Sequence, residues 1–447
     1  MRSRSPILFV CLAIGLGLPA IVSTGLGRPT AGLSRASLPT PFRITPARNG
    51  LFFGDSVLYN PKLDRYVVFF DEQLSGWKQE YFSRVLDANG QPLCGAQKIF
   101  SSDPGLVGIP WIAYNPREDT FFFVSITRKR SIYGLALDSR GRPLGGRATP
   151  ISIKGDSGED TIVRPNVAWI PSINQFAVSW ISSKTDDPAN SRNGYYLAMF
   201  DNHFKKVFGP RKVREQSVKN CYNLRAFVLP LEDKLLWGSA DDAQGSAMKP
   251  ILWFTDFKGE VLESYGKKGL VYPGDAVPYG GWVRAALDPD HGVVLLYWTY
   301  SDHSNSGKMK YWENSTRMMS TDGVFKTSVF KMPRRQPFQS DLIAEYAEAE
   351  KRFFLVCQEY IIFSNSSYYQ FGGKLWGFYM DEKGRLENKQ GKHVVAPIPL
   401  TETNLDPHGR IYLGDVASRP EDNSFFIFYG LNDRQSNDDQ VWGLIYK

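Results

Sequence analysis

The stretch that decides the fold is Val57-Leu58-Tyr59-Asn60-Pro61 followed by Tyr66-Val67-Val68-Phe69-Phe70, two short apolar strands joined by a turn. The same order recurs with Tyr114-Asn115-Pro116 and with Trp169-Ile170-Pro171 at the end of the first strand. Seven such turns follow one another along the chain, at Pro61, Pro116, Pro171, Pro230, Pro289, Glu348 and Pro420. Their spacings of 55, 55, 59, 59, 59 and 72 residues indicate seven copies of one structural unit.

Each unit also contains a third strand that closes in a tight Asp/Gly turn before a fourth strand. Clear examples are Asp87-Ala88-Asn89-Gly90, Asp138-Ser139-Arg140-Gly141 and Asp381-Glu382-Lys383-Gly384. The Asp side chain accepts local backbone hydrogen bonds and the Gly adopts positive φ, so these segments predict hairpin turns. Four short strands in a unit of about 50 residues are typical of one blade of a β-propeller.

The last unit lacks its fourth strand, because residues 441–446 match a third strand and only Lys447 follows. Residues 41–46 resemble the missing strand. We therefore predict an all-β fold over residues 40–447, a seven-bladed β-propeller of four-stranded antiparallel blades, with the ring closed by an N-terminal strand that completes the last blade. One segment conflicts with this prediction, since residues 344–350 have strong helical propensity where the repeat requires a strand end and a turn.

The units resemble the blades of secreted bacterial-type seven-bladed β-propeller repeat proteins, which are built on the pattern P-x-V-A-Y-N-P, a strand, and D-x-x-G-x-P-L. The resemblance rests on structural turns, so it implies a fold and no specific functional family. Ser320-Thr321-Asp322-Gly323 departs from the S-x-D-x-G-x-T-W spacing of sialidase turns. WD dipeptides at the ends of blades are also absent from the sequence.

The N-terminus predicts export from the cytoplasm. Arg2 and Arg4 precede an uncharged run from Ile7 to Gly27, which is typical of a signal peptide. The run is also long enough to span a bilayer, so an uncleaved membrane anchor is the alternative. We expect residues 1–27 to be this leader, residues 28–39 to be a linker, and the protein to be extracytoplasmic: secreted, periplasmic or held at a membrane by its N-terminus.

Composition excludes several classes of protein. The 447-residue chain is 42% hydrophobic with a net charge of +7, which is typical of a globular protein with a mild basic excess. Lys and Arg are not clustered as a nucleic-acid footprint requires, so we expect no nucleic-acid partner. Cys94, Cys221 and Cys357 follow the leader without a CxxC or CxxH pattern, which disfavours zinc binding and allows one disulfide at most.

Loop lengths distinguish the two faces of the predicted ring. Turns after the first and third strands are short, whereas the connections on the opposite face are long and varied, so we expect any site there, around the central channel. The innermost strands place these residues just before their apolar segments: Ser56, Trp111, Asn166, Arg225, Arg284, Ile343 and Asp415. Slightly upstream lie Asp55, Arg164, Tyr222, Trp282 and Asp341.

The first functional hypothesis is a binding or scaffold module for a glycan or an extracytoplasmic protein. Arg binds carboxylates through two parallel hydrogen bonds, and aromatic rings provide flat apolar surfaces on which sugars stack. The ligand-binding candidates are Trp111, Arg164, Asn166, Tyr222, Arg225, Trp282 and Arg284. A competing structural interpretation is that channel residues are polar because they are wetted, and that Arg–Asp pairs there only satisfy each other.

The alternative function is a carbohydrate-active hydrolase or lyase. Asp55, Asp341 and Asp415 lie at the start of inner strands, where two carboxylates at suitable separation would permit acid/base or nucleophilic hydrolysis. We expect no Glu among the positions that line the channel, and the sequence contains no G-x-S-x-G motif, which makes an enzyme the weaker hypothesis. A third hypothesis is a structural subunit that docks in a larger assembly.

Metal-binding signals are weak. The loops at residues 186–190 and 432–439 contain oxygen ligands suited to Ca²⁺ but lack the D-x-D-x-D-G spacing of a dedicated site. We therefore predict no metal site and no cofactor, with Ca²⁺ at one of these loops as the weak alternative.

Overall fold

The structure, a computed structural model, describes residues 38–46, 51–74, 79–101, 110–126, 132–144, 151–153, 161–184, 194–215, 226–241, 247–266, 269–274, 277–278, 280–303, 309–333, 338–362, 371–393, 397–402, 409–433 and 438–447. Leu38–Lys447 form one compact unit. Every regular element within these ranges is a β-strand, and none of the described residues belongs to a helix that could cross a membrane. The expected leader at residues 1–27 lies outside the described residues.

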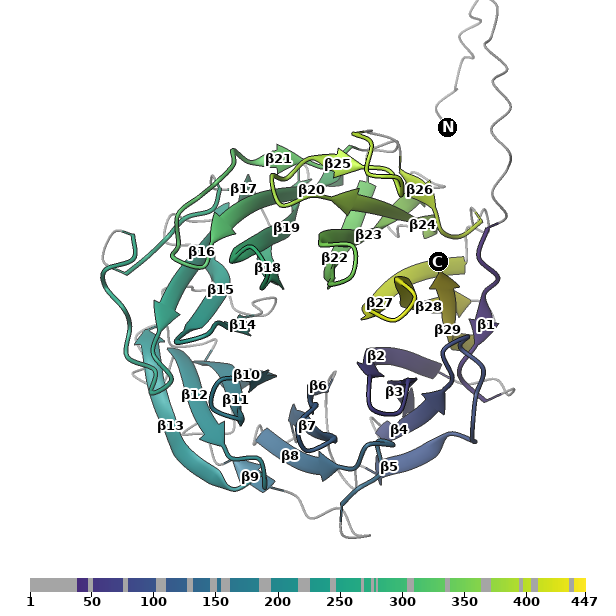
Figure 1. Cartoon of the computed structure of the whole chain (residues 1–447), viewed down its shortest axis with the longest axis horizontal. Coiled ribbons are helices and arrows are strands. Elements are labelled where there is room, and N and C mark those ends of the chain that lie inside the picture. Colours follow the sequence, from purple (N-terminus) through teal and green to yellow (C-terminus); the bar gives the residue numbers. More distant parts are fainter. Residues whose placement is uncertain are drawn as a thin grey trace, which may run out of the picture. The chain divides into compact units, whose positions relative to one another are not determined.

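Seven antiparallel blades of four strands surround a central axis, as Figure 1 shows. The first four blades are β2 (Leu51–Asn60), β3 (Arg65–Gln73), β4 (Gln79–Leu86) and β5 (Gln97–Ser101); β6 (Trp111–Asn115), β7 (Thr120–Ile126), β8 (Ile132–Leu137) and β9 (Ile151–Ile153); β10 (Thr161–Ile170), β11 (Gln175–Lys184), β12 (Gly194–Phe200) and β13 (Lys206–Glu215); and β14 (Phe227–Pro230), β15 (Leu235–Asp241), β16 (Ala247–Thr255) and β17 (Val277–Pro278).

Blade five comprises β18 (Gly280–Asp288), β19 (Val293–His303), β20 (Met309–Ser320) and β21 (Phe330–Lys331). Blade six comprises β22 (Phe338–Ala347), β23 (Arg352–Ile362), β24 (Phe371–Met380) and the short outer strands β25 (Leu386–Glu387) and β26 (Ile398–Pro399). Blade seven comprises β27 (Gly409–Arg419), β28 (Ser424–Asp433), β29 (Asp438–Tyr446) and β1 (Phe42–Arg43). The prediction of a seven-bladed all-β propeller is confirmed.

The N-terminal strand β1 completes the last blade, as the sequence predicts. Phe42 is paired with Gly443 and Arg43 with Trp442, and the backbone N–H of Ile44 donates to the carbonyl of Val441 at 2.9 Å. The side chain of Ile44 is fully buried in the apolar cluster between blades seven and one. The first and last described segments of the propeller therefore belong to one sheet, and this pairing closes the ring.

The apolar core lies between neighbouring blades rather than at the centre of the ring. In β3, Tyr66, Val68 and Phe70 pack in the cluster shared with blade seven, whereas Val67 and Phe69 pack in the cluster shared with blade two. Successive side chains of a strand point to opposite faces of its sheet, and both faces are covered here. This arrangement explains why the second strand of each unit is apolar without alternation.

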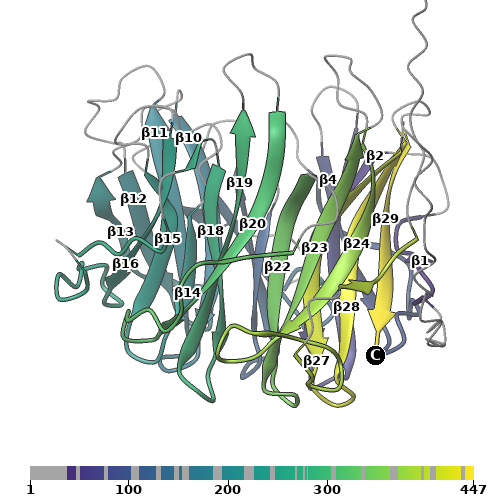
Figure 2. The same cartoon turned by 90° about the horizontal axis from the view of Figure 1, so that it is seen from above.

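The short turns are built by side chains that bind the local backbone. Oδ1 of Asp138 accepts hydrogen bonds from the backbone N–H groups of Arg140 and Arg142, both at 2.9 Å, and Gly141 adopts φ 72°. At the other kind of short turn, Oδ1 of Asn115 accepts from Arg117 N–H at 2.9 Å. The described turns after the first strands lie together at one end of the blades, at the bottom of Figure 2.

The segment with helical propensity, residues 344–350, is not helical. Its first part belongs to β22, which pairs with β23 from Phe338 to Ala347, and a turn at residues 348–351 follows, in which Lys351 adopts φ 53°. The competing interactions explain this outcome, since Ile343 and Ala344 are buried between blades and a helix would remove both from the core.

Candidate functional site at the inner strands

The structure describes the predicted site residues to different extents. The side chains of Trp111, Asn166, Arg284 and Asp415 are described, whereas only the backbone is described for Asp55, Arg164, Trp282 and Asp341, on β2, β10, β18 and β22. Tyr222 and Arg225 lie outside the described residues, as do parts of the long-loop connections, including the candidate calcium loop at residues 186–190. The roles assigned to these residues remain predictions.

The backbone gives two of the candidate carboxylates a special position. In β2 the pairing with β3 shifts between Gly54 and Ser56, so Asp55 is the extra residue of a β-bulge. In β22 a similar shift between Ser340 and Leu342 makes Asp341 the extra residue. A bulge changes the direction of its side chain relative to the regular strand, and bulges are common beside functional sites.

Asp415 connects the inner strands of blades seven and one. Its Oδ2 accepts hydrogen bonds from Ser56 Oγ at 2.9 Å and from the backbone N–H of Val57 at 3.0 Å, and its Oδ1 accepts from Val416 N–H at 2.9 Å. Both oxygens therefore have partners within the ring. Burial raises the pKa of this carboxyl, while these hydrogen bonds and the nearby Arg284 guanidinium act in the opposite direction.

Glu345 is another acid of the inner strands, and its side chain faces blade seven, beyond the positions at which the sequence leads us to expect no Glu. It lies on β22, and Ser418 Oγ of blade seven donates to its Oε1 at 3.4 Å. Burial, reinforced by the negative charge of Asp415, raises the pKa of Glu345 to about 8. A comparison of the blades could have found it, because the other six units carry apolar residues at this position.

Arg284 and Tyr297 are further described ionisable residues near Asp415. They are opposite each other in the pairing of β18 with β19, and the Arg284 charge favours the ionised form of both Tyr297 and Asp415. Burial nevertheless raises the pKa of Tyr297. Asp415 thus interacts electrostatically with the Arg284 guanidinium of blade five and with the Glu345 carboxyl of blade six.

The remaining described candidates belong partly to the core. Trp111 is half-buried and packs against the apolar cluster between blades two and three. Asn166 is 7% exposed and lies opposite Ser179 in the pairing of β10 with β11. Trp111 and Asp415, which occupy equivalent positions on their inner strands, thus both contact the next blade.

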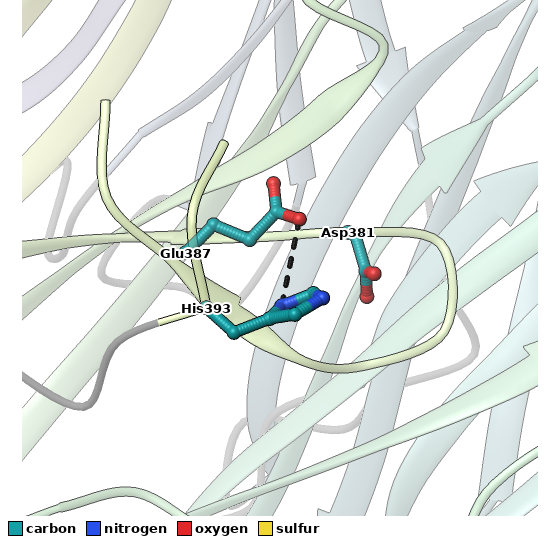
Figure 3. A group of neighbouring side chains, drawn as sticks. All are labelled: Asp381, Glu387 and His393. Atoms are coloured by element: carbon teal, nitrogen blue, oxygen red, sulfur yellow. Dashed lines mark ion pairs between the residues drawn. The ribbon is translucent and has the colours of Figure 1, made fainter. Parts of the chain in front are cut away.

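A possible metal-binding cluster lies elsewhere, at the outer end of blade six. Ligand atoms of Asp381, Glu387 and His393 lie within 4.8 Å of one another, and Figure 3 shows them around the turn after β24. Asp381 already forms a 2.5 Å ion pair with Arg385, and Arg352 lies 3.6 Å from Glu387. Asp138 and Arg142 make the same pair at the equivalent turn of blade two, so we assign Asp381 to turn formation rather than to a metal.

Two described cysteines, Cys94 and Cys357, are free thiols. Burial raises the pKa of the Cys357 thiol, which disfavours the reactive thiolate. Cys221 lies outside the described residues. The thiols that can be described therefore add no chemistry to the inner strands.

No protein-family model matches the chain. No curated protein matches it either. Among solved structures, it is similar to the β-propeller domain of the Trilobed protease from Pyrococcus furiosus, with a TM-score of 0.46, 9% identity, and coverage of 89% of this chain and 96% of that domain.

Two further solved structures have comparable TM-scores and sequence identities. Prolyl oligopeptidase B from Galerina marginata gives a TM-score of 0.44 with 12% identity over 86% of this chain, which spans about half (47%) of that enzyme. A mutant of AofleA from Arthrobotrys oligospora gives 0.42 with 8% identity, over 78% of this chain and 86% of that one. Similarity at this level gives no information on activity or ligand.

Proposed function

We propose that this propeller is a binding module that recognises a carboxylate-bearing glycan at the inner strands. The observation that carries the proposal is that Trp111 and Arg284 occupy equivalent positions on inner strands and both keep part of their surface exposed. A guanidinium binds a carboxylate through charge-assisted hydrogen bonds, and an indole ring supports a sugar face. An extracytoplasmic protein with acidic side chains is the competing ligand.

The hydrogen bonds of Asp415 favour a binding function over hydrolysis. Its two oxygens accept three hydrogen bonds that join blade seven to blade one, which accounts for the residue without a catalytic role. A hydrolase would need a second carboxylate facing the same glycosidic bond, and Asp55 and Asp341 are the remaining candidates. Loss of reducing-end release in Asp55→Asn or Asp341→Asn would support the hydrolase alternative.

We also propose that the protein acts outside the cytoplasm. The uncharged run from Ile7 to Gly27 after two Arg residues supports this location. An uncleaved leader would hold the propeller at a membrane surface, whereas cleavage would release it. N-terminal sequencing of the protein from the exported fraction distinguishes the two outcomes.

The binding proposal is tested by replacing Arg284. Arg284→Gln is expected to weaken binding of an acidic polysaccharide about 10- to 100-fold, because a lost charge-assisted hydrogen bond costs roughly 1.5–3 kcal/mol. Binding is measured by calorimetry against acidic and neutral polysaccharides of similar size. The control is Arg142→Gln, an exposed Arg at a short turn of blade two.

Three results would contradict the glycan proposal. The first is equal binding of acidic and neutral polysaccharides, and the second is unchanged affinity in Arg284→Gln. The third is the absence of polysaccharide binding together with capture of an acidic extracytoplasmic protein, which would favour the protein ligand. Release of new reducing ends during the same experiment would favour the hydrolase.

A further inference from the structure

The inner strand β27 of blade seven has a carboxyl group on each side. On one side its own Asp415 accepts hydrogen bonds from Ser56 and Val57 of blade one, at 2.9 and 3.0 Å. On the other side Glu345 of blade six contacts Ser418 at 3.4 Å. Blade seven is also the blade that the N-terminal strand β1 completes. An acidic group therefore lies at the contact of β27 with each neighbouring blade, beside the apolar clusters and the Gln358 and Tyr412 hydrogen bonds that also hold the strand.

The contact at Glu345 is particular to this pair of blades. The residues at the equivalent position of the other units are all apolar: Leu58, Ala113, Ala168, Phe227, Ala286 and Ala417. Its partner Ser418 is also an exception, since the units of blades one, two, three and six have an aromatic residue there: Tyr59, Tyr114, Trp169 and Tyr346. A polar pair has thus replaced an apolar contact at one junction of the ring.

The surroundings of Glu345 disfavour its negative charge. Asp415 on β27 and Glu348 in the turn after β22 are acidic neighbours, whereas Ser418 donates hydrogen bonds to it from its hydroxyl and backbone. Arg284 on β18 interacts with Asp415, and the neutral Tyr297 on β19 is affected by both acids. Burial and Asp415 together raise the pKa of Glu345 to about 8, so the group is largely protonated at neutral pH.

We propose that blade seven is a pH-sensitive closure of the ring, in which ionisation of Glu345 weakens the packing of β27 between blades six and one. Glu345 and Asp415 each keep part of their surface exposed in the closed ring. Loss of the proton would still place a second negative charge beside Asp415 at the junction of blades six and seven. An opened blade seven would separate the two acids and hydrate Glu345 fully, which removes this penalty. Alkaline conditions therefore favour opening at this blade over opening elsewhere in the ring.

The direction of the pH effect follows from the two pKa values. Glu345 has an ordinary pKa of 4.5 when solvated and about 8 in the folded ring. Between these values the folded state binds more protons than the opened state, so stability falls as pH rises. The protonated Glu345 contributes its full stabilisation of blade seven at a pH below 4.5, its pKa in water. This stabilisation is lost once the pH has risen above about 8, its pKa in the folded ring.

The test is hydrogen exchange of the full chain at about pH 6.5 and about pH 9, corrected for the intrinsic rate. We expect protection of β27 and β29 to fall by at least about tenfold relative to β7 and β11 of blades two and three. Glu345→Gln keeps a polar group of the same size without the charge. The protection of β27 and β29 in this variant should therefore differ by less than about twofold between the two pH values. Glu263→Gln, at an exposed acid of blade four, should behave like the parent protein.

A blade seven that responds to pH no more than blade two would overturn the proposal, as would an undiminished response in Glu345→Gln. If that variant does not fold, infrared spectroscopy of the parent protein provides the second measurement. A protonated carboxyl band that disappears between about pH 6.5 and about pH 9 is expected. Absence of such a band at about pH 6.5 would also refute the proposal.

Discussion

Phe204 shows how packing outweighs local strain in one turn. The equivalent position in other Asp/Gly turns is a glycine with positive φ, such as Gly90 at 80° and Gly141 at 72°, yet Phe204 adopts φ 61°. A non-glycine residue in this conformation costs about 1–2 kcal/mol. The ring of Phe204 is buried against Phe122 and Phe176, with centroid distances of 5.3 and 5.5 Å.

Phe204→Gly is therefore expected to lower the free energy of unfolding by about 2 kcal/mol. Removal of a buried Phe costs about 3–5 kcal/mol, and relief of the backbone strain offsets about 1–2 kcal/mol of this loss. Urea denaturation measures the difference. His203→Ala, an exposed neighbour in the same turn, should stay within about 0.5 kcal/mol of the parent protein. A Phe204→Gly protein more stable than the parent would show that strain dominates.

Glu345 shows where the sequence was insufficient for the site. The candidate positions on the inner strands are the residue before each apolar segment and those upstream, whereas Glu345 lies two residues further along. It also falls within residues 344–350, whose helical propensity obscured the strand. Proximity to Asp415 depends on the packing of blade six against blade seven, because the two residues are 70 positions apart in the sequence. Their mutual effect on pKa therefore required coordinates.

The strand β1 is short, yet it closes the ring through a buried side chain. Only Phe42 and Arg43 pair with β29, while Ile44, which follows them, is fully buried in the cluster between blades seven and one. Phe42 also packs edge-on against Phe426, with ring centroids 5.6 Å apart. Apolar contacts of Phe42 and Ile44, together with hydrogen bonds to Val441 that continue to Thr45, thus hold this element in place.

Ile44→Ala is expected to destabilise the propeller by about 2–4 kcal/mol, because it removes buried methylene groups and leaves a cavity between two blades. Thermal unfolding followed by circular dichroism measures the loss. Val324→Ala is the matched control, since Val324 is 64% exposed. Equal melting temperatures for Ile44→Ala and the parent protein would mean that β1 does not contribute to closure.

The strands were predictable because their signals are local and repeated. Turn side chains such as Asp138 and Asn115 bind the backbone of their own turn, so the motif and the structure coincide. The bulges at Asp55 and Asp341 were not predictable, because they depend on the pairing of each inner strand with its neighbour. Bulges are common beside functional sites, so these two backbone positions bear on the candidate site.

The closed ring determines what the molecule can do. Its inner strands converge on one axis in Figure 1, so residues from distant units become neighbours, as Arg284 and Asp415 illustrate. Rigid blades with buried faces give such residues fixed positions, and preorganised groups bind a ligand at lower entropic cost. We expect the ligand to contact several blades at once.

The most direct test of binding at the inner strands is hydrogen exchange of the protein with and without a saturating acidic polysaccharide. Contact at Trp111, Asn166 and Arg284 predicts slower exchange in β6, β10 and β18, with little change in the outer strands β9 and β13. Slower exchange confined to the outer strands, or no change in any blade despite measured binding, would contradict a ligand site at the inner strands.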